Sequence, residues 1–129
     1  SGPPRVMNLI GLTDDLDEAL DASPAGSGLP ITISRGDMYW LMGVTEFGRL
    51  HFDEAAPALM HWSGTTHPNS RLPDHGFRLT RLDVVHPDAA TLLADFPALE
   101  TVDLVSVRKG PEKRLIASIS TPEGKRVLA

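Results

Sequence analysis

A β-hairpin in the first third of the sequence is the local feature that most constrains how this chain can fold. The stretch from Ile31 to Ser34 alternates apolar and polar side chains, which is typical of a strand with one buried face. Turn-forming residues follow at positions 35–37, and residues 38–44 make a second, more apolar run. We therefore predict two antiparallel strands joined by a tight turn.

Periodicity and capping signals place further elements on both sides of the hairpin. A helix is predicted over residues 14–22, because acidic side chains fill its first turns and apolar ones recur on one face. One interpretation of the ambiguous segment 50–62 is a second helix that Asp53 caps, and another helix is predicted at 89–96. Strands are predicted at residues 6–10, 77–85, 102–107, 115–120 and 126–128.

The order of these elements predicts an α+β fold. It would consist of an N-terminal strand-helix-hairpin unit followed by an antiparallel meander with two further helices. The chain has 129 residues, of which 41% are hydrophobic, and this is enough for one core. We predict a single domain over residues 1–129, with the Pro- and Gly-rich loop at 63–76 as the one candidate internal boundary.

Charge and cysteine content narrow the classes of function. The net charge of −5 argues against binding of nucleic acid through its phosphates and suits a basic protein partner. The chain has no cysteine, which excludes disulfides, thiolate metal sites and a cysteine nucleophile. No apolar run approaches the roughly 20 residues that span a bilayer. We therefore expect a cytoplasmic protein with no membrane partner.

Three short runs together suggest a family. The run ITISRG at 31–36 is a strand that ends in a glycine turn, YWLM at 39–42 is an apolar strand, and EFGRL at 46–50 starts with an acidic and an aromatic residue. With the helix before them, these runs make residues 9–50 resemble the N-terminal half of Phd/YefM-type antitoxins. In that family a short strand and a helix lead into a hairpin and a second helix.

This resemblance implies a non-enzymatic protein-binding module, an antitoxin- or immunity-like neutraliser in a bacterial toxin–antitoxin (conflict) system. Because the helix at 14–22 is acidic and repels phosphate, its partner would be a basic protein rather than DNA. Tyr39 and Trp40 point to opposite faces of one strand, so one of them can anchor an interface. We expect binding residues at Arg35, Tyr39, Trp40 and Arg71, and a homodimer is an open alternative.

A cluster of histidines supports a different function. All five histidines lie between positions 51 and 86, and three of them are near acids: His51 precedes Asp53, His75 follows Asp74, and His86 precedes Asp88. The candidate catalytic residues are His51, His67 and His75 with Asp53 and Asp74. A histidine paired with a carboxylate can act as a general acid or base. The alternative hypothesis is therefore a small enzyme acting on a nucleotide or nucleic acid, either ribonuclease-like or ADP-ribosyltransferase-like.

In this enzyme hypothesis Arg35 or Arg71 would hold phosphate. His51 and Asp53 would also share one face of a strand, an arrangement that suits a divalent metal ion. No histidine spacing matches a known metal-binding motif, however, so we predict neither a metal site nor a cofactor. The competing interpretation is that these histidines occupy ordinary loop and capping positions.

Overall fold

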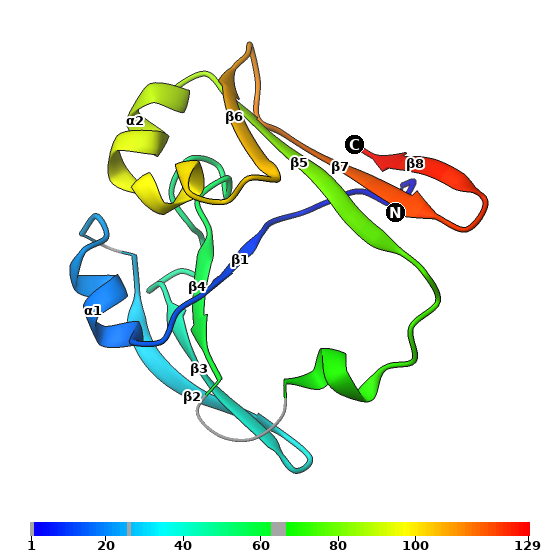
Figure 1. Ribbon diagram of the computed structural model, residues 1–129. Coiled ribbons are helices and arrows are strands. Elements are labelled where there is room, and N and C mark those ends of the chain that lie inside the picture. The colour runs from blue at the N-terminus through cyan, green and yellow to red at the C-terminus, as the bar shows by residue number, and fades with distance from the viewer. Residues whose placement is uncertain (1, 26, 63–66) are drawn as a thin grey trace.

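The computed structural model describes residues 2–25, 27–62 and 67–129 and consists mainly of β-strands (Figure 1). The helices are α1 (Leu16–Asp21), α2 (Ala89–Asp95) and two 3₁₀ helices, η1 (Pro68–Arg71) and η2 (Pro97–Glu100). The strands are β1 (Ile10–Leu12), β2 (Leu29–Arg35), β3 (Met38–Val44), β4 (Ala58–His61), β5 (Arg78–His86), β6 (Val105–Lys109), β7 (Arg114–Thr121) and β8 (Gly124–Leu128).

The strands form two mixed sheets. Sheet A has the order β1-β4-β3-β2, and sheet B has the order β6-β5-β7-β8. In sheet A, β1 runs parallel to β4, and in sheet B, β5 runs parallel to β6 and antiparallel to β7. Each sheet is built from a strand, a helix and three more strands in chain order. The two sheets differ in the position of their first strand. Strand β1 lies at the edge of sheet A, whereas β5 lies inside sheet B, between β6 and β7.

The predicted α+β fold with a C-terminal meander is therefore wrong. The structure is mostly β, with eight strands and only two short α-helices among the described residues. Strand β5 lies between β6 and β7, so β6 and β7 are not neighbours and the last strands are no meander. The meander was inferred from nearness in sequence, whereas the parallel pairing of β5 with β6 spans the whole of α2 and η2.

The hairpin and two of the helices are confirmed. Strands β2 and β3 pair from Leu29 opposite Val44 to Arg35 opposite Met38, and Gly36 takes a positive φ of 61° in the turn. Helices α1 and α2 lie within the ranges predicted for them. The predicted loop at 63–76 is described only from residue 67, where it contains η1.

The helix that was one interpretation of the ambiguous segment 50–62 is absent. Residues Phe52, Asp53 and Glu54 form a turn with φ values of 57°, 55° and 69°, and the strand β4 follows. The apolar run beginning at Ala55 fits a helix equally well, but Ala55 and Ala56 are buried in the core and β4 pairs with strands on both sides. Tertiary pairing thus overrides the local helical pattern.

The hydrophobic core lies mainly between sheet B and its helices. Leu92 and Val84 are fully buried, and Phe96, Leu99 and Leu115 belong to the same cluster. The N-terminal half contributes to this core through the segments that precede β1 and β4. Helix α1 packs so closely on sheet A that a Cβ on Gly43 would lie 2.8 Å from the Cδ2 atom of Leu20. Helix α1 therefore covers the face of sheet A to which Gly43 belongs.

Candidate functional site

The face of sheet A opposite to α1 is apolar. Trp40 pairs with Ile33, and Met42 pairs with both Ile31 and Met60, so these side chains point to one face, away from Gly43. We call this surface the Trp/Met face, and its members are Leu12, Leu29, Ile31, Ile33, Met38, Trp40, Met42, Met60 and Trp62.

Two indole rings lie at the centre of the Trp/Met face. The ring centroids of Trp40 and Trp62 are 5.0 Å apart at an interplanar angle of 38°, and His67 meets the second indole edge-on at 4.9 Å. Both indole Nε1 atoms are buried and have no hydrogen-bond partner among the described residues. An unpaired buried N–H is costly, so each donor would gain a partner if the acceptor of a ligand displaced the side chains that now cover it.

Much of the Trp/Met face is uncovered. Leu29 is 74% exposed, Leu12 is 63% exposed and Ile31 is 46% exposed. Contiguous exposed apolar surface is unusual on a soluble protein and typically marks a binding site. In Figure 1 the chain after β4, which carries η1, runs on the side of sheet A opposite to α1. This segment therefore lies on the same side of sheet A as the Trp/Met face.

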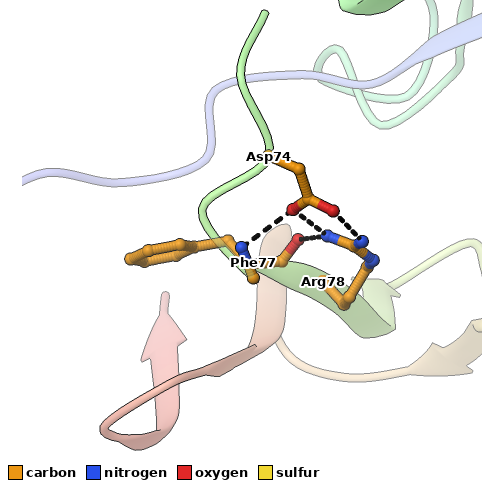
Figure 2. Close-up of polar contacts among 4 residues, drawn as sticks. Asp74, Phe77 and Arg78 are labelled. Atoms are coloured by element: carbon orange, nitrogen blue, oxygen red, sulfur yellow. Dashed lines mark hydrogen bonds and ion pairs between the residues drawn. The ribbon is translucent and has the colours of Figure 1, made fainter.

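Two ion pairs hold the segment that carries η1. Arg71 donates two hydrogen bonds of 3.2 Å to Asp37, at the tip of the β2–β3 hairpin. Arg78 donates to both carboxylate oxygens of Asp74, at 2.9 and 2.6 Å, and to the carbonyl of Phe77 (Figure 2). These hydrogen bonds from the guanidinium groups lower the pKa of Asp37 and of Asp74 below the ordinary value of 3.8.

The predicted binding residues fall in different places. Trp40 lies in the Trp/Met face, whereas Tyr39 lies on the other face of β3 and is 49% exposed. Arg35 is the last residue of β2 and pairs with Met38, so its side chain belongs to the end of the Trp/Met face. Arg71 is engaged by Asp37. The structure thus brings Arg35 and Trp40 to one surface and separates Tyr39 from them.

The predicted catalytic residues do not pair with one another among the described residues. His51 is hydrogen-bonded through Nε2 to the carbonyl of Ala25 at 3.1 Å, and His67 accepts from the backbone N–H of Asn69 at the start of η1. Asp74 is occupied by Arg78 and Asp53 by His86, and His75 is exposed. Their catalytic roles stay a prediction that these contacts do not support.

Among the described residues His86 forms the one histidine–aspartate pair, which the sequence pattern did not reveal. Its Nε2 lies 2.9 Å from Asp53 Oδ2, and its Nδ1 accepts the backbone N–H of Asp88 at 3.0 Å. Because a backbone N–H can only donate, the proton of the neutral ring is on Nε2 and is directed to the carboxylate. Both ring nitrogens are therefore occupied, and this buried imidazole has no lone pair left for a general base.

His61 lies on the helix-covered side of sheet A, beside a cavity of about 380 Å³. Its Nδ1 donates to the carbonyl of Thr13 at 2.9 Å, which leaves the lone pair on Nε2. Three aspartates of the α1 region also line this cavity: Asp14, Asp15 and Asp17. Within residues 2–25, 27–62 and 67–129, however, no three histidine or acidic side chains are grouped so that they could hold a metal ion.

Two strand-helix-strand units, each with its own mixed sheet, define a class of small mixed β-proteins. A model of the family described as glyoxalase-like domain matches residues 1–99, which include all of sheet A. The chain therefore belongs to the glyoxalase-like domain family. No curated protein and no solved structure gives a significant match.

The family match corrects the inferred resemblance to Phd/YefM-type antitoxins, which is wrong. The structure adds a second reason, because residues 45–57 form turns where the antitoxin pattern requires a helix. The antitoxin and immunity roles in a toxin–antitoxin system are wrong for the same reason. A basic protein partner and a homodimer stay predictions. None of the described helices has the length and apolar character to cross a membrane.

Proposed function

We propose that this glyoxalase-like protein binds a small planar molecule on the Trp/Met face. The observation that carries the proposal is the pair of contacting indoles, Trp40 and Trp62, whose buried N–H groups have no acceptor in the described residues. The ligand would stack on the indoles and accept a hydrogen bond from at least one of them. Membership of the family is compatible with either an enzyme or a binding protein.

The energetics of such a face favour flat, largely apolar ligands. Stacking between aromatic groups adds about 0.5–1.5 kcal/mol beyond the burial of apolar area. A hydrogen bond that pairs a buried donor adds about 0.5–1.5 kcal/mol more. The three methionines around the indoles are flexible and polarisable, so the face can adjust to the outline of a ring system.

The placement of the acid–base residues supports binding over catalysis. His67 is the one histidine that contacts the indoles within the described ranges, and its Nδ1 already accepts a backbone N–H. The buried pair of His86 and Asp53 lies with the core residues Phe52 and Phe96 rather than on sheet A. The Trp/Met face itself supplies aromatic rings, thioethers and N–H donors, which are groups for recognition.

Fluorescence tests this proposal directly, because the chain has only two tryptophans and both lie at the proposed site. The probe is N-phenyl-1-naphthylamine, a neutral aromatic whose emission rises in apolar surroundings. We expect saturable binding with energy transfer from tryptophan. Replacing Trp40→Leu should weaken binding at least about fivefold, since one stacking ring and one N–H donor are removed.

The matched control is Tyr39→Leu, which removes an aromatic from the neighbouring position on the opposite face of β3. This variant should bind the probe as the unmodified protein does. The proposal is wrong if the probe does not bind, or if both variants bind it as tightly as the unmodified protein.

A further inference from the structure

We propose that the ligand of the Trp/Met face is an aromatic anion, and that Arg35 holds its acidic group. This inference rests on the proposed function, because it concerns the same surface. It adds a negative charge to the planar ligand proposed above, a property that the apolar side chains of the face do not indicate. It also assigns a role to Arg35, the one cation that the described strands place at the end of an otherwise neutral face.

The position of Arg35 sets the size of the ligand. Arg35 lies opposite Met38, and Met38 is two residues from Trp40 on the same face of β3. Adjacent residues of a strand are about 3.4 Å apart, so the Cα atoms that carry the cation and the first indole are separated by about 7 Å along the strand. A carboxylate, sulfonate or phosphate attached to a two-ring aromatic can reach across this separation.

The guanidinium of Arg35 is available for a ligand. It forms no ion pair with any described residue, whereas Arg71, Arg78 and Arg81 all do. The residues outside the described ranges are serine, glycine and threonine, so they contain no acid that could pair with it. Arginine is also well suited to the task, because its planar fork binds planar acids through two hydrogen bonds.

The charges around the face favour an anion although the whole chain is acidic. Two carboxylates of the hairpin turn and of the segment that carries η1, Asp37 and Asp74, are each neutralised by an arginine in a two-bond ion pair. The acids of the α1 region lie on the covered side of sheet A, around the cavity of His61. A ligand on the Trp/Met face therefore meets one unpaired cation and no unpaired acid from the described strands of that face.

A pair of probes isolates the contribution of the charge. One is the neutral N-phenyl-1-naphthylamine, and the other is 8-anilinonaphthalene-1-sulfonate, which has the same aromatic skeleton and an added sulfonate. Replacing Arg35→Gln should weaken the sulfonate about tenfold, since a charge-assisted contact is lost. The same substitution should change the affinity for the neutral probe less than about twofold, because stacking is retained.

The control is Arg114→Gln, which removes a cation from a competing anion site, a cavity of about 320 Å³ where Arg114 lies beside Arg5 and Lys113. This variant should bind both probes normally. The inference is overturned if Arg35→Gln leaves the sulfonate affinity unchanged, if it weakens both probes equally, or if Arg114→Gln is the variant that loses the sulfonate. Failure of the neutral probe to bind the unmodified protein would instead overturn the proposed function.

Discussion

At the scale of single residues, the most unusual feature is the turn before β4. Phe52, Asp53 and Glu54 all have positive φ values, a conformation that costs a non-glycine residue roughly 1–2 kcal/mol. Asp53 is held there by His86, whose side chain is 5% exposed while that of the aspartate is 77% exposed. A buried imidazole thus fixes an exposed carboxylate, the reverse of a catalytic pair that presents its histidine to substrate.

This interpretation predicts the outcome of two substitutions at one position. Asp53→Asn keeps an oxygen that can accept the Nε2–H proton, and asparagine tolerates positive φ, so stability should change by less than about 0.5 kcal/mol. Asp53→Ala leaves a buried donor unpaired and should lower the free energy of unfolding by about 1–3 kcal/mol. Urea unfolding measures the free energy of unfolding of both variants. Equal destabilisation by the two variants would show that the charge, rather than the hydrogen bond, holds the turn.

Residue-scale features were only partly predictable. Alternation along β3 predicts that Tyr39 and Trp40 lie on opposite faces, as the structure shows, but it does not indicate which of the two contacts a ligand. Trp62 was missed because it was assigned to a helix, in which it would have no fixed relation to Trp40. The pairing of His86 with Asp53 joins residues 33 positions apart, and no local pattern encodes such a contact.

At the scale of elements, the approach of the chain to the hairpin depends on one glycine. Gly28 precedes β2 with a φ of 121°, and a Cβ at this position would lie 2.7–2.9 Å from backbone atoms of Val44. Backbone atoms cannot move aside as the end of a side chain can. Both the conformation and the space therefore require glycine here.

We expect Gly28→Ala to lower the free energy of unfolding by more than about 2 kcal/mol, because strain and overlap add. Gly48→Ala is the matched control, since Gly48 also has a positive φ, of 69°, but a Cβ at this position would have no described atom within 4 Å. That variant should lose only about 1 kcal/mol, from backbone strain alone. Thermal unfolding measures the stability of both variants. Equal losses of stability would contradict the role of the Val44 contact.

The ion pairs of the segment that carries η1 predict a dependence on pH. Hydrogen bonds from Arg71 and Arg78 lower the pKa of Asp37 and Asp74 in the folded state. A carboxyl with a lowered folded pKa stabilises the fold above its unfolded pKa of about 3.8, and this contribution is lost as the pH falls further. Both groups are exposed, so the effect is small and screened by salt.

The double variant Asp37→Asn, Asp74→Asn tests this dependence. Its urea midpoint should lie below that of the unmodified protein by a constant amount between about pH 5 and pH 7. The difference should shrink steadily below about pH 4, where the unfolded carboxyls become protonated. A difference that grows on acidification, or that stays constant down to about pH 2, would contradict the assigned role of the two ion pairs.

Element-scale prediction succeeded where the signal was local. The hairpin follows from alternation and a turn, and α1 follows from acidic capping and a single apolar stripe. Strand β4 could not be recognised, because its four residues follow two buried alanines and the combined apolar run also fits a helix. The order of sheet B depends on the parallel pairing of β5 with β6, which is set by packing of α2 and not by adjacent sequence.

At the scale of the whole molecule, the two units of similar element order have different roles. Sheet B and its helices hold the main core, so this unit supplies most of the buried residues of the core cluster. The acids Asp14, Asp15 and Asp17 lie on the helix-covered side of sheet A, and the apolar side chains of the Trp/Met face lie on the uncovered side. This separation of charge explains how an acidic chain can present a neutral surface that ends in a cation.

Nuclear magnetic resonance gives the most direct test of the Trp/Met face as the ligand site. With two tryptophans in the chain, a ¹⁵N-labelled sample has two indole N–H signals, and both belong to the proposed site. On titration with 8-anilinonaphthalene-1-sulfonate, both indole signals should shift in a saturable way while amides of the core strand β5, such as that of Val84, stay in place. Shifts confined to sheet B with the two indole signals unmoved would contradict the account.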